Sequence, residues 1–174
     1  IEIIVVDGER RFGNNFCLPA GPLREPTSRL NSVDFVISKE NPLRHEFKLS
    51  LIPDHFYQLI QPKIKKTLDY FHGKTLHAVA GIGNPDQFFN SLRKLNLKII
   101  EHPFPDHYLF KPHDFSYGSD AIIIMTEKDA VKCVGFVDAR LWCLNTKTEL
   151  DTNLLNTVLK RVTTLNNNLK SSSG

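Results

Sequence analysis

Two proline-rich segments of the chain carry charged side chains in types and spacings that suit chemistry. The first, Leu18-Pro19-Ala20-Gly21-Pro22-Leu23-Arg24-Glu25-Pro26, surrounds Arg24 and Glu25 with residues that restrict the backbone. The guanidinium fork of Arg24 matches a phosphate group, and the carboxylate of Glu25 can orient the arginine or bind a cation. The alternative is a solvated ion pair on the surface, which is the more common arrangement for such residues.

The second segment, Glu101-His102-Pro103-Phe104-Pro105-Asp106-His107-Tyr108, gathers two histidines and two acids after an apolar run. An imidazole held in a rigid loop suits proton transfer, because histidine takes up and releases a proton near neutral pH. Metal binding is disfavoured, since Pro103 and Pro105 exclude the helical His-x-x-x-His spacing and no third ligand is evident. A structural histidine is the remaining alternative.

A glycine-containing segment joins a strand-like run to a helix-like one. In Gly81-Ile82-Gly83-Asn84-Pro85 the glycines permit close backbone approach, and the first N–H groups of the helix can bind a phosphate. The segment is not a P-loop, because no Lys-Ser/Thr follows, and it lacks the third glycine of the Rossmann fingerprint. The simpler interpretation is that Asn84 caps the helix and Pro85 occupies its first turn.

The segment Thr126-Glu127-Lys128-Asp129 directly follows an apolar run. It therefore stands at the carboxyl end of a predicted strand, the edge at which open α/β sheets bind ligands, so Thr126 and Lys128 are candidate contacts to a substrate or a phosphate. An equally good interpretation makes Thr126 the N-cap of a helix whose acids favour the positive end of the helix dipole.

Apolar runs and amphipathic stretches alternate along most of the chain. Strands separated by helix-length segments are typical of an α/β fold, with a parallel sheet covered on both faces. Strands are expected at residues 1–6, 33–37, 76–80, 98–102, 121–125 and 141–144, and helices at residues 85–95, 127–134 and 151–165.

Residues 45–63 interrupt this alternation. Phe47, Leu49 and Leu51 alternate with polar residues, which is the period of a half-exposed strand, and Pro53-Asp54 divides the stretch into two segments that we interpret as a hairpin or ribbon. We therefore predict three parts: residues 1–44 as the end of a sheet, residues 45–63 as a β-ribbon linker, and residues 64–174 as a smaller α/β/α domain. A sheet begun elsewhere should leave the first part with an unpaired strand edge and an uncovered apolar face.

The composition narrows the class of protein. Of the 174 residues 41% are hydrophobic, which indicates a globular chain, and the formal net charge of only +3 argues against a nucleic-acid partner. No apolar run approaches the roughly 18 residues that span a bilayer. Three cysteines without a CxxC spacing indicate neither a disulfide framework nor a zinc ribbon, which fits a reducing compartment. Because the sequence opens with Ile1 and has Met125 as its single methionine, we expect it to be the later part of a longer protein.

Four strings, taken together and in order, carry a family resemblance: DGERRFGNNFCLPAGPLREP, AVAGIGNPDQFFNSLRKLNL, HPFPDHYLF and MTEKDAVKC. They resemble the C-terminal half of the tetraacyldisaccharide 4'-kinases, enzymes of lipid A biosynthesis. Asn15 and Asn96 stand where that family usually has glycine, and Tyr108 replaces a frequent second histidine.

The resemblance implies a kinase of Gram-negative bacteria that transfers the ATP γ-phosphate to the 4'-hydroxyl of an acylated glucosamine disaccharide 1-phosphate. It also implies ATP and Mg²⁺ as cofactors, and a peripheral location at the cytoplasmic face of the inner membrane, reached through an N-terminal segment that would precede Ile1. In such enzymes the first domain is of the P-loop type, so residues 1–44 would be the end of a P-loop-type sheet. The phosphate loop itself would precede this chain, and the chain alone would be inactive.

The resemblance also suggests roles for single residues. Arg24 and Glu25 match the family's Leu-Arg-Glu motif beside the nucleotide phosphates. His107 matches the histidine of a catalytic Asp–His pair whose aspartate would precede Ile1. Phosphoryl transfer needs charge stabilisation and a proton acceptor, which Arg24 and His107 can supply. Glu25 is the one candidate metal contact in this chain, through a water molecule.

Two other functions are compatible with parts of the sequence. A non-catalytic nucleotide- or sugar-binding α/β module would have no need of a P-loop. A metal-dependent hydrolase would use His102, Asp106 and His107 as ligands, which the proline spacing makes the weaker hypothesis.

Overall fold

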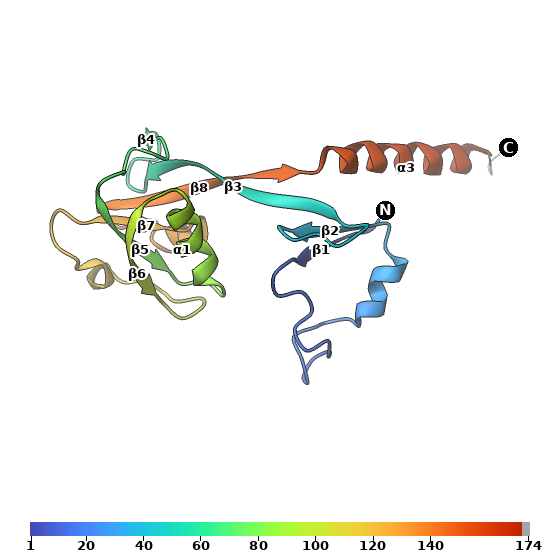
Figure 1. Cartoon of the computed structure of the whole chain (residues 1–174), viewed down its shortest axis with the longest axis horizontal. Helices are drawn as coiled ribbons and strands as arrows, with labels where there is room; N and C mark the ends of the chain where they lie inside the picture. The colour runs from blue at the N-terminus through green and yellow to red at the C-terminus, as the bar shows by residue number, and fades with distance from the viewer. Residues whose placement is uncertain (172–174) are drawn as a thin grey trace. The chain divides into compact units, whose positions relative to one another are not determined.

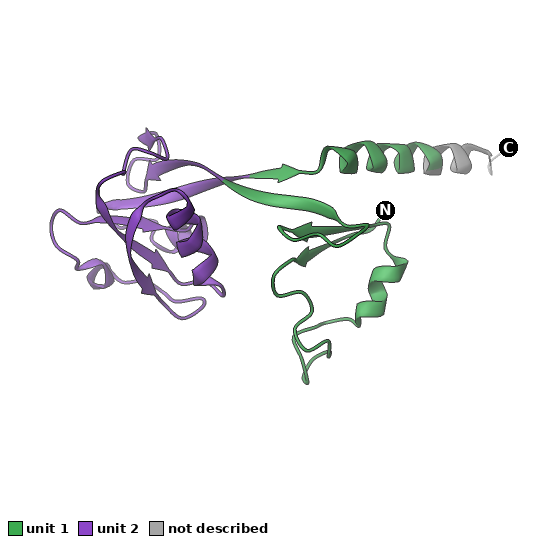
Figure 2. Ribbon diagram, viewed as in Figure 1, with its two compact units in different colours: residues 1–52, 148–174 green, residues 53–147 purple. Residues whose placement is uncertain are grey.

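The chain divides into two compact units in the computed structural model, which describes the backbone of residues 1–171 and the side chains of residues 1–164. The first unit comprises residues 1–52 and 148–174, and the second comprises residues 53–147 (Figure 2). The elements, in chain order, are β1 (Ile3–Asp7), η1 (Thr27–Ser32), β2 (Phe35–Lys39), β3 (Phe47–Gln58), β4 (Lys65–Lys66), β5 (Thr75–Ala80), α1 (Pro85–Lys94), β6 (Lys98–Pro103), η2 (Pro112–Phe115), β7 (Ile122–Met125), α2 (Glu127–Lys132), β8 (Leu141–Leu150) and α3 (Thr152–Ser171) (Figure 1).

The first unit is a small parallel sheet with one helix. β1 pairs with β2 in parallel from Ile3 opposite Phe35, and β2 pairs with the start of β3. A small core lies between this sheet and α3, formed by Phe35, Ile37 and Leu154 with Phe47, Leu49 and Val158 packed against them.

β1 is a terminal strand of the sheet among the described strands. Its side chains Ile3 and Val5 are 44% and 61% exposed, although they are apolar. The predicted strand edge and uncovered apolar face are therefore present in the first unit.

The second unit is built around β5, which pairs in parallel with β6 on one side and with β7 on the other. β7 continues in parallel to β8, and α1 lies against β5 and β6 (Figure 1). One sheet face is covered by α1 and the segment around Phe71, with Leu76, Ala78 and Phe89 in the core. The other face is covered by α2 and residues 104–117, with Val79, Ile123, Met125 and Cys143 in the core. The prediction of a parallel sheet covered on both faces is confirmed for this unit.

Local sequence signals account for both helices of the second unit. Asn84 caps α1 by accepting a hydrogen bond from the Gln87 N–H at 3.4 Å, and Pro85 occupies the first turn. Thr126 caps α2 by accepting from the Asp129 N–H at 3.1 Å. The capping interpretation of both segments is therefore confirmed.

The prediction that Pro53-Asp54 divides a hairpin is wrong. β3 runs without interruption through Pro53, and its antiparallel partner is β4, with Phe56 opposite Lys66 and Tyr57 opposite Lys65. A proline lacks only the amide N–H, so a strand tolerates it where that side of the backbone makes no ladder bond.

The boundaries between the two units also differ from the predicted domain boundaries. β8 extends to Leu150, past the apolar run 141–144, and α3 then packs Leu154 and Val158 against the sheet of the first unit. The sequence predicted one continuous domain over residues 64–174, because a discontinuous unit has no local signal. No helix of the described residues is long and apolar enough to cross a bilayer.

Asn15 and Asn96 occupy left-handed backbone positions, with φ of 64° and 56°. Asparagine tolerates this conformation better than most residues, and glycine adopts it without strain. The backbone therefore explains why glycine is usual at both positions in the family that the sequence resembles.

Candidate functional site

Arg24 and Glu25 follow a tight loop of the first unit. Within that loop the Leu18 N–H donates to Leu23 O at 2.8 Å and the Gly21 N–H to Cys17 O at 3.1 Å. A Cβ at Gly21 would lie 2.3 Å from a backbone oxygen, so this close turn requires glycine. The loop holds its shape by its own main chain, as the prolines predicted.

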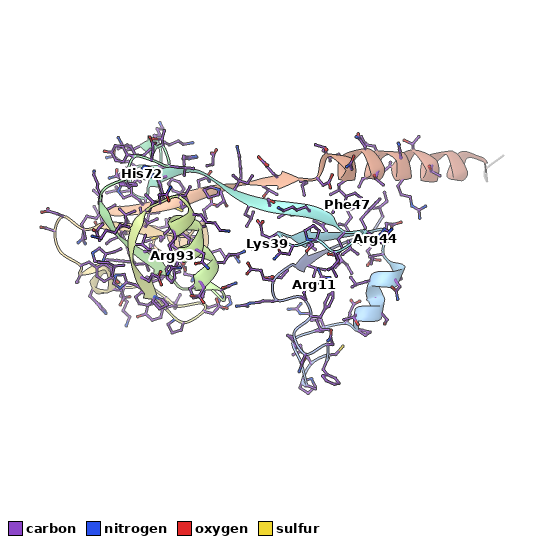
Figure 3. All side chains as sticks on the ribbon, viewed as in Figure 1. Arg11, Lys39, Arg44, Phe47, His72 and Arg93 are labelled. Carbon is purple, nitrogen blue, oxygen red and sulfur yellow. The ribbon has the colours of Figure 1, made fainter. Side chains whose placement is uncertain are left out.

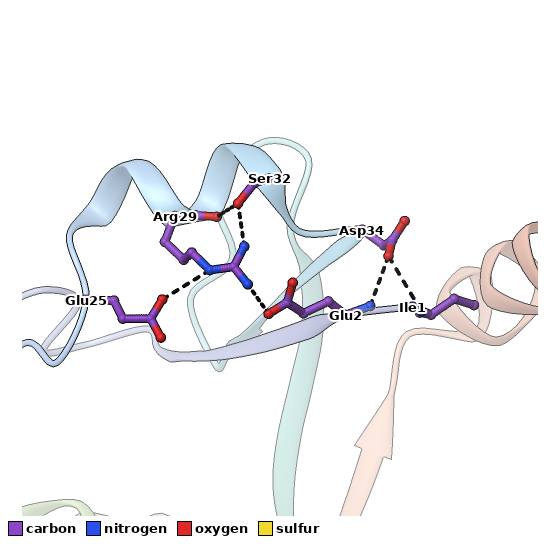
Figure 4. Close-up of polar contacts among 6 residues, drawn as sticks. All are labelled: Ile1, Glu2, Glu25, Arg29, Ser32 and Asp34. Carbon is purple, nitrogen blue, oxygen red and sulfur yellow. Dashed lines mark hydrogen bonds and ion pairs between the residues drawn. The ribbon is translucent and has the colours of Figure 1, made fainter.

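Glu25 contacts Arg29 rather than Arg24. The Arg29 Nε donates to Glu25 Oε2 at 3.1 Å, and the same guanidinium bonds to Glu2 and Ser32 (Figure 4). The hypothesis that Glu25 orients Arg24 is not supported, because the arginine four residues later provides its ion pair. Arg24 itself is exposed.

A second arginine of the first unit, which the sequence reasoning missed, is held more firmly. Arg11 lies in the loop after β1 (Figure 3) and binds Glu46 with both arms, at 2.9 and 2.7 Å. The hydrogen bond from Arg11 holds the pKa of Glu46 below its ordinary value of 4.5. Arg11 has a left-handed φ of 49°, and no local sequence pattern marks its pairing with a residue 35 positions away.

His107 lies at the tip of the loop that follows β6 in the second unit. Its side chain is 92% exposed, and its Nε2 lies 3.8 Å from Asp106 Oδ2. The His107 N–H donates to Asp106 Oδ1 at 3.0 Å, and the backbone φ is +60°. Among the described residues, five others that are not glycine also have a left-handed φ, so this backbone conformation does not single out His107, and its catalytic role stays a prediction.

Aromatic side chains form the base of this loop. The ring centroids of Phe104, Tyr108 and Phe110 lie 4.8 to 5.3 Å apart. The Phe104 N–H donates to Ala80 O at 2.8 Å, which joins the start of the loop to the end of β5. The loop is thus anchored below an accessible imidazole.

The parallel strands β5, β6 and β7 end at the same edge, where Asn84, His107 and Thr126 follow them. The oxygens of Asn84 and Thr126 are used in capping, and the Thr126 hydroxyl also donates to Asp129 Oδ2 at 2.8 Å. Lys128 is exposed. Asn84 and Thr126 are half-buried, and substrate contact by any of these three weaker candidates stays a prediction.

His102 lies apart from His107 in its contacts. Its Nε2 lies 2.9 Å from His77 Nδ1, and both rings stack on Tyr117, with centroids 4.1 and 4.6 Å from it. Burial lowers the pKa of both imidazoles, and the charge of His77 lowers that of His102 further. Within the described residues, no three His, Cys, Asp or Glu side chains are arranged to hold a metal ion, so the His102, Asp106 and His107 ligand set is not assembled.

The sequence reasoning also missed an ion pair behind the His107 loop. Asp129 is fully buried, and Lys132 Nζ lies 2.8 Å from its Oδ1. From the sequence, Asp129 is a candidate substrate contact or a favourable charge near a helix start, and neither interpretation predicts its burial against Lys132. The signal that was available is a lysine three residues after it, one helical turn further on.

Comparison with known proteins gives one consistent result. The family model described as Tetraacyldisaccharide-1-P 4'-kinase matches residues 1–164. A tetraacyldisaccharide 4'-kinase of Methylobacillus flagellatus is 44% identical over 166 residues, which cover 95% of this chain and 50% of the relative. That of Nitrosococcus oceani is 50% identical over 143 residues, which cover 82% of this chain and 42% of the relative. The chain therefore spans about half the length of the curated relatives it matches.

A solved structure is similar in fold. The crystal structure titled as the "apo" form of LpxK from Aquifex aeolicus in complex with ATP matches with a TM-score of 0.65 at 23% identity. The match covers 91% of this chain and 51% of that chain. The mixed α/β fold with a mainly parallel sheet is therefore shared with that structure.

Proposed function

Because the chain belongs to the tetraacyldisaccharide-1-phosphate 4'-kinase family, we propose that it forms the C-terminal part of an enzyme that transfers the ATP γ-phosphate to the 4'-hydroxyl of tetraacyldisaccharide 1-phosphate. The observation that carries this proposal is the family match over residues 1–164. A named substrate with four acyl chains supports a peripheral location at the inner membrane, on its cytoplasmic face, where ATP is available.

Residues 1–44 contribute the end of the kinase's P-loop-type sheet in this proposal. The support is the exposed apolar side of β1, since Ile3 and Val5 are suited to being covered by further structure. The loop that carries Arg24 then belongs to the phosphate side of the active site. The sequence has no complete Gly-x-x-x-x-Gly-Lys-Ser/Thr loop, because Leu68 stands at the first glycine position before Gly73-Lys74-Thr75, so the 174-residue chain should transfer no phosphate by itself.

Arg24 and His107 carry the chemistry of this proposal. The exposed guanidinium of Arg24 stabilises negative charge on the phosphate chain during transfer. An imidazole nitrogen of His107 accepts the proton of the 4'-hydroxyl while the hydroxyl oxygen forms a bond to the γ-phosphorus, and the bond from that phosphorus to the β-phosphate oxygen breaks to release ADP. ATP supplies the phosphoryl group when bound.

Glu25 fits a metal ligand less well than the sequence suggested, because its carboxylate already pairs with Arg29. Mg²⁺ remains part of the proposal as the ion that accompanies ATP, with no cluster of ligands for it among the described residues.

The decisive test replaces His107 in the longer kinase that contains this sequence. His107→Ala should lower kcat by about 10²- to 10⁴-fold, the usual range for a general base, with little change in nucleotide affinity. The matched control is His113→Ala, whose side chain is also exposed, at 72%. Full activity of His107→Ala would return His107 to a structural role.

The second test concerns Arg24. Arg24→Ala should lower kcat by more than it raises KM, because the charge that it meets develops during transfer. Arg24→Lys should not restore the rate fully, since an ammonium group lacks the bidentate fork. Arg44→Ala, at another exposed arginine of the first unit, is the control. Wild-type rates for Arg24→Ala would identify it as a surface residue.

A further inference from the structure

A buried ion pair lies directly behind the loop that carries His107. Asp129 is 0% exposed and the side chain of Lys132 is 19% exposed, with 2.8 Å between Oδ1 and Nζ. Removing two charges from water is costly, and a pair of well-packed apolar residues is often as stable. The residues to which Asp129 and Lys132 bond therefore matter more here than any contribution of the pair to stability.

The two charged side chains bond to both polar backbone atoms of one residue, Gly81. The Gly81 N–H donates to Asp129 Oδ2 at 3.0 Å, and Lys132 Nζ donates to Gly81 O at 2.9 Å. Thr126 Oγ1 donates to the same Asp129 oxygen at 2.8 Å, and Lys132 donates to the other, so both carboxylate oxygens accept hydrogen bonds. These bonds join the end of β5 to α2 across 48 and 51 residues of sequence.

Gly81 in turn packs directly against the loop that carries His107. A Cβ at this position would lie 3.1 Å from Phe110 Cζ and 3.4 Å from Tyr108 Cβ. The preceding residue, Ala80, accepts the Phe104 N–H, and Lys132 Nζ lies 5.6 Å from the centre of the Phe110 ring. The start and the end of the loop both contact the segment that the ion pair holds.

His107 has few contacts of its own to set its direction. Its side chain is almost fully exposed and its ion-pair partner is the adjacent Asp106, on the same loop tip. Its orientation therefore follows from the backbone of residues 104–110, including the left-handed φ at His107 itself.

We propose that Asp129 and Lys132 are positioning residues for His107. Their bonds to the N–H and the carbonyl oxygen of Gly81 fix the backbone against which Phe104, Tyr108 and Phe110 pack, and the loop fixed in this way sets the orientation of the imidazole. The catalytic meaning of this arrangement rests on the proposed function. A displacement of about 1 Å at a reacting group costs on the order of 100-fold in rate, which is why a rigidly held loop is of use.

The test neutralises the pair without leaving a lone buried charge. Asp129→Asn combined with Lys132→Met keeps the volumes and removes both charges. The matched control is Asp138→Asn with Arg140→Met, an ion pair of 2.7 Å in the same unit that bonds to Gly118 instead. Gly81→Ala is a second, single-methyl variant, whose Cβ would press on Phe110 and on Asp129 Oδ1 at 3.3 Å.

The first measurement is NMR on the 174-residue chain. In the Asp129/Lys132 variant and in Gly81→Ala, we expect the Phe104 amide to exchange at least about tenfold faster and the φ-dependent coupling of His107 to change. The core amide of Leu76 should keep its exchange rate, and the control pair should leave all three readouts unchanged. An unaltered Phe104 exchange rate and His107 coupling in both variants would overturn the positioning of the loop.

The second measurement is kinetics of the longer kinase. The Asp129/Lys132 variant should lower kcat about tenfold or more with KM for ATP within about twofold, and it should have no further effect when added to His107→Ala. Equal losses in the presence and absence of His107 would overturn the inference, because the pair would then act on overall structure. A displaced loop with unchanged kcat would instead overturn the role proposed for His107, and would leave the positioning of the loop established.

Discussion

The two units of the chain differ in how far they cover their sheets. The second unit covers both faces of its sheet with two large apolar clusters and packs the buried carboxylate of Asp129 against Lys132. The first unit has one small core around Phe35, Ile37 and Leu154. Both units also expose apolar side chains, for example Val5 in the first unit and Val137 in the second, so the size of the buried core is what distinguishes them.

The two candidate catalytic loops differ in how far along the sequence their supporting hydrogen bonds reach. The loop before Arg24 is closed by hydrogen bonds between residues that are close in sequence. The His107 loop depends on Gly81, which α2 side chains hold from 48 and 51 positions away. The Arg24 loop should therefore keep its shape in many contexts, and the His107 loop should respond to changes far from it.

Amide exchange should show the largest difference between the units. We expect amides of β5 and β7 to exchange on the order of 100-fold more slowly than those of β1 and β2, because apolar clusters cover both faces of the sheet around β5, whereas the core beside β1 and β2 is small. Mass spectrometry of the chain in D₂O measures this directly. Greater protection of residues 1–44 would reverse the comparison.

A matched pair of valine truncations should separate the units next. Val79→Ala removes two methyl groups from a fully buried site in β5 and should lower the free energy of unfolding of the second unit by about 2 kcal/mol. Val5→Ala, at a site 61% exposed in β1, should change stability by less than about 0.5 kcal/mol. Denaturant titration with exchange readout for each unit checks both values, and equal costs would contradict the difference in burial.

Mild acid should act on the second unit first. Burial lowers the pKa of His77 and His102 below the ordinary 6.5, so the unfolded chain binds protons that the folded unit excludes. Their contribution to stability is complete above about pH 6.5 and is lost as pH falls through the lowered pKa values. In the first unit, hydrogen bonds lower the pKa values of Asp7 and Glu46 below 3.8 and 4.5, so that contribution is lost only in stronger acid.

Stability of each unit between pH 7.5 and pH 5 provides the measurement. The second unit should lose stability over this range while the first unit keeps it, and His77→Gln with His102→Gln should reduce the loss. His72→Gln, at an exposed histidine of the same unit, is the control. A loss of equal size in both units, or one that persists without His77 and His102, would exclude these imidazoles as its source.

Sequence patterns that span only a few residues determined the positions of most strands, helices and helix caps. Apolar runs and caps located the strands and helices after residue 74 to within a few residues, except that β8 and α3 each extend about six residues further. They also assigned Asn84 and Thr126 as caps, because a cap and the N–H that it accepts are three residues apart. The prolines before Arg24 and around His107 indicated constrained loops for the same local reason.

Only the tertiary structure decided which distant residues meet. Pro53 lies within one continuous strand, and Glu25 pairs with Arg29, which also binds Glu2, 27 residues earlier in the chain. Asp129 and Lys132 bond to Gly81 because folding brings the end of β5 next to α2. A periodic pattern specifies the face that a strand buries but not the element that covers it, so these contacts have no signature in the sequence.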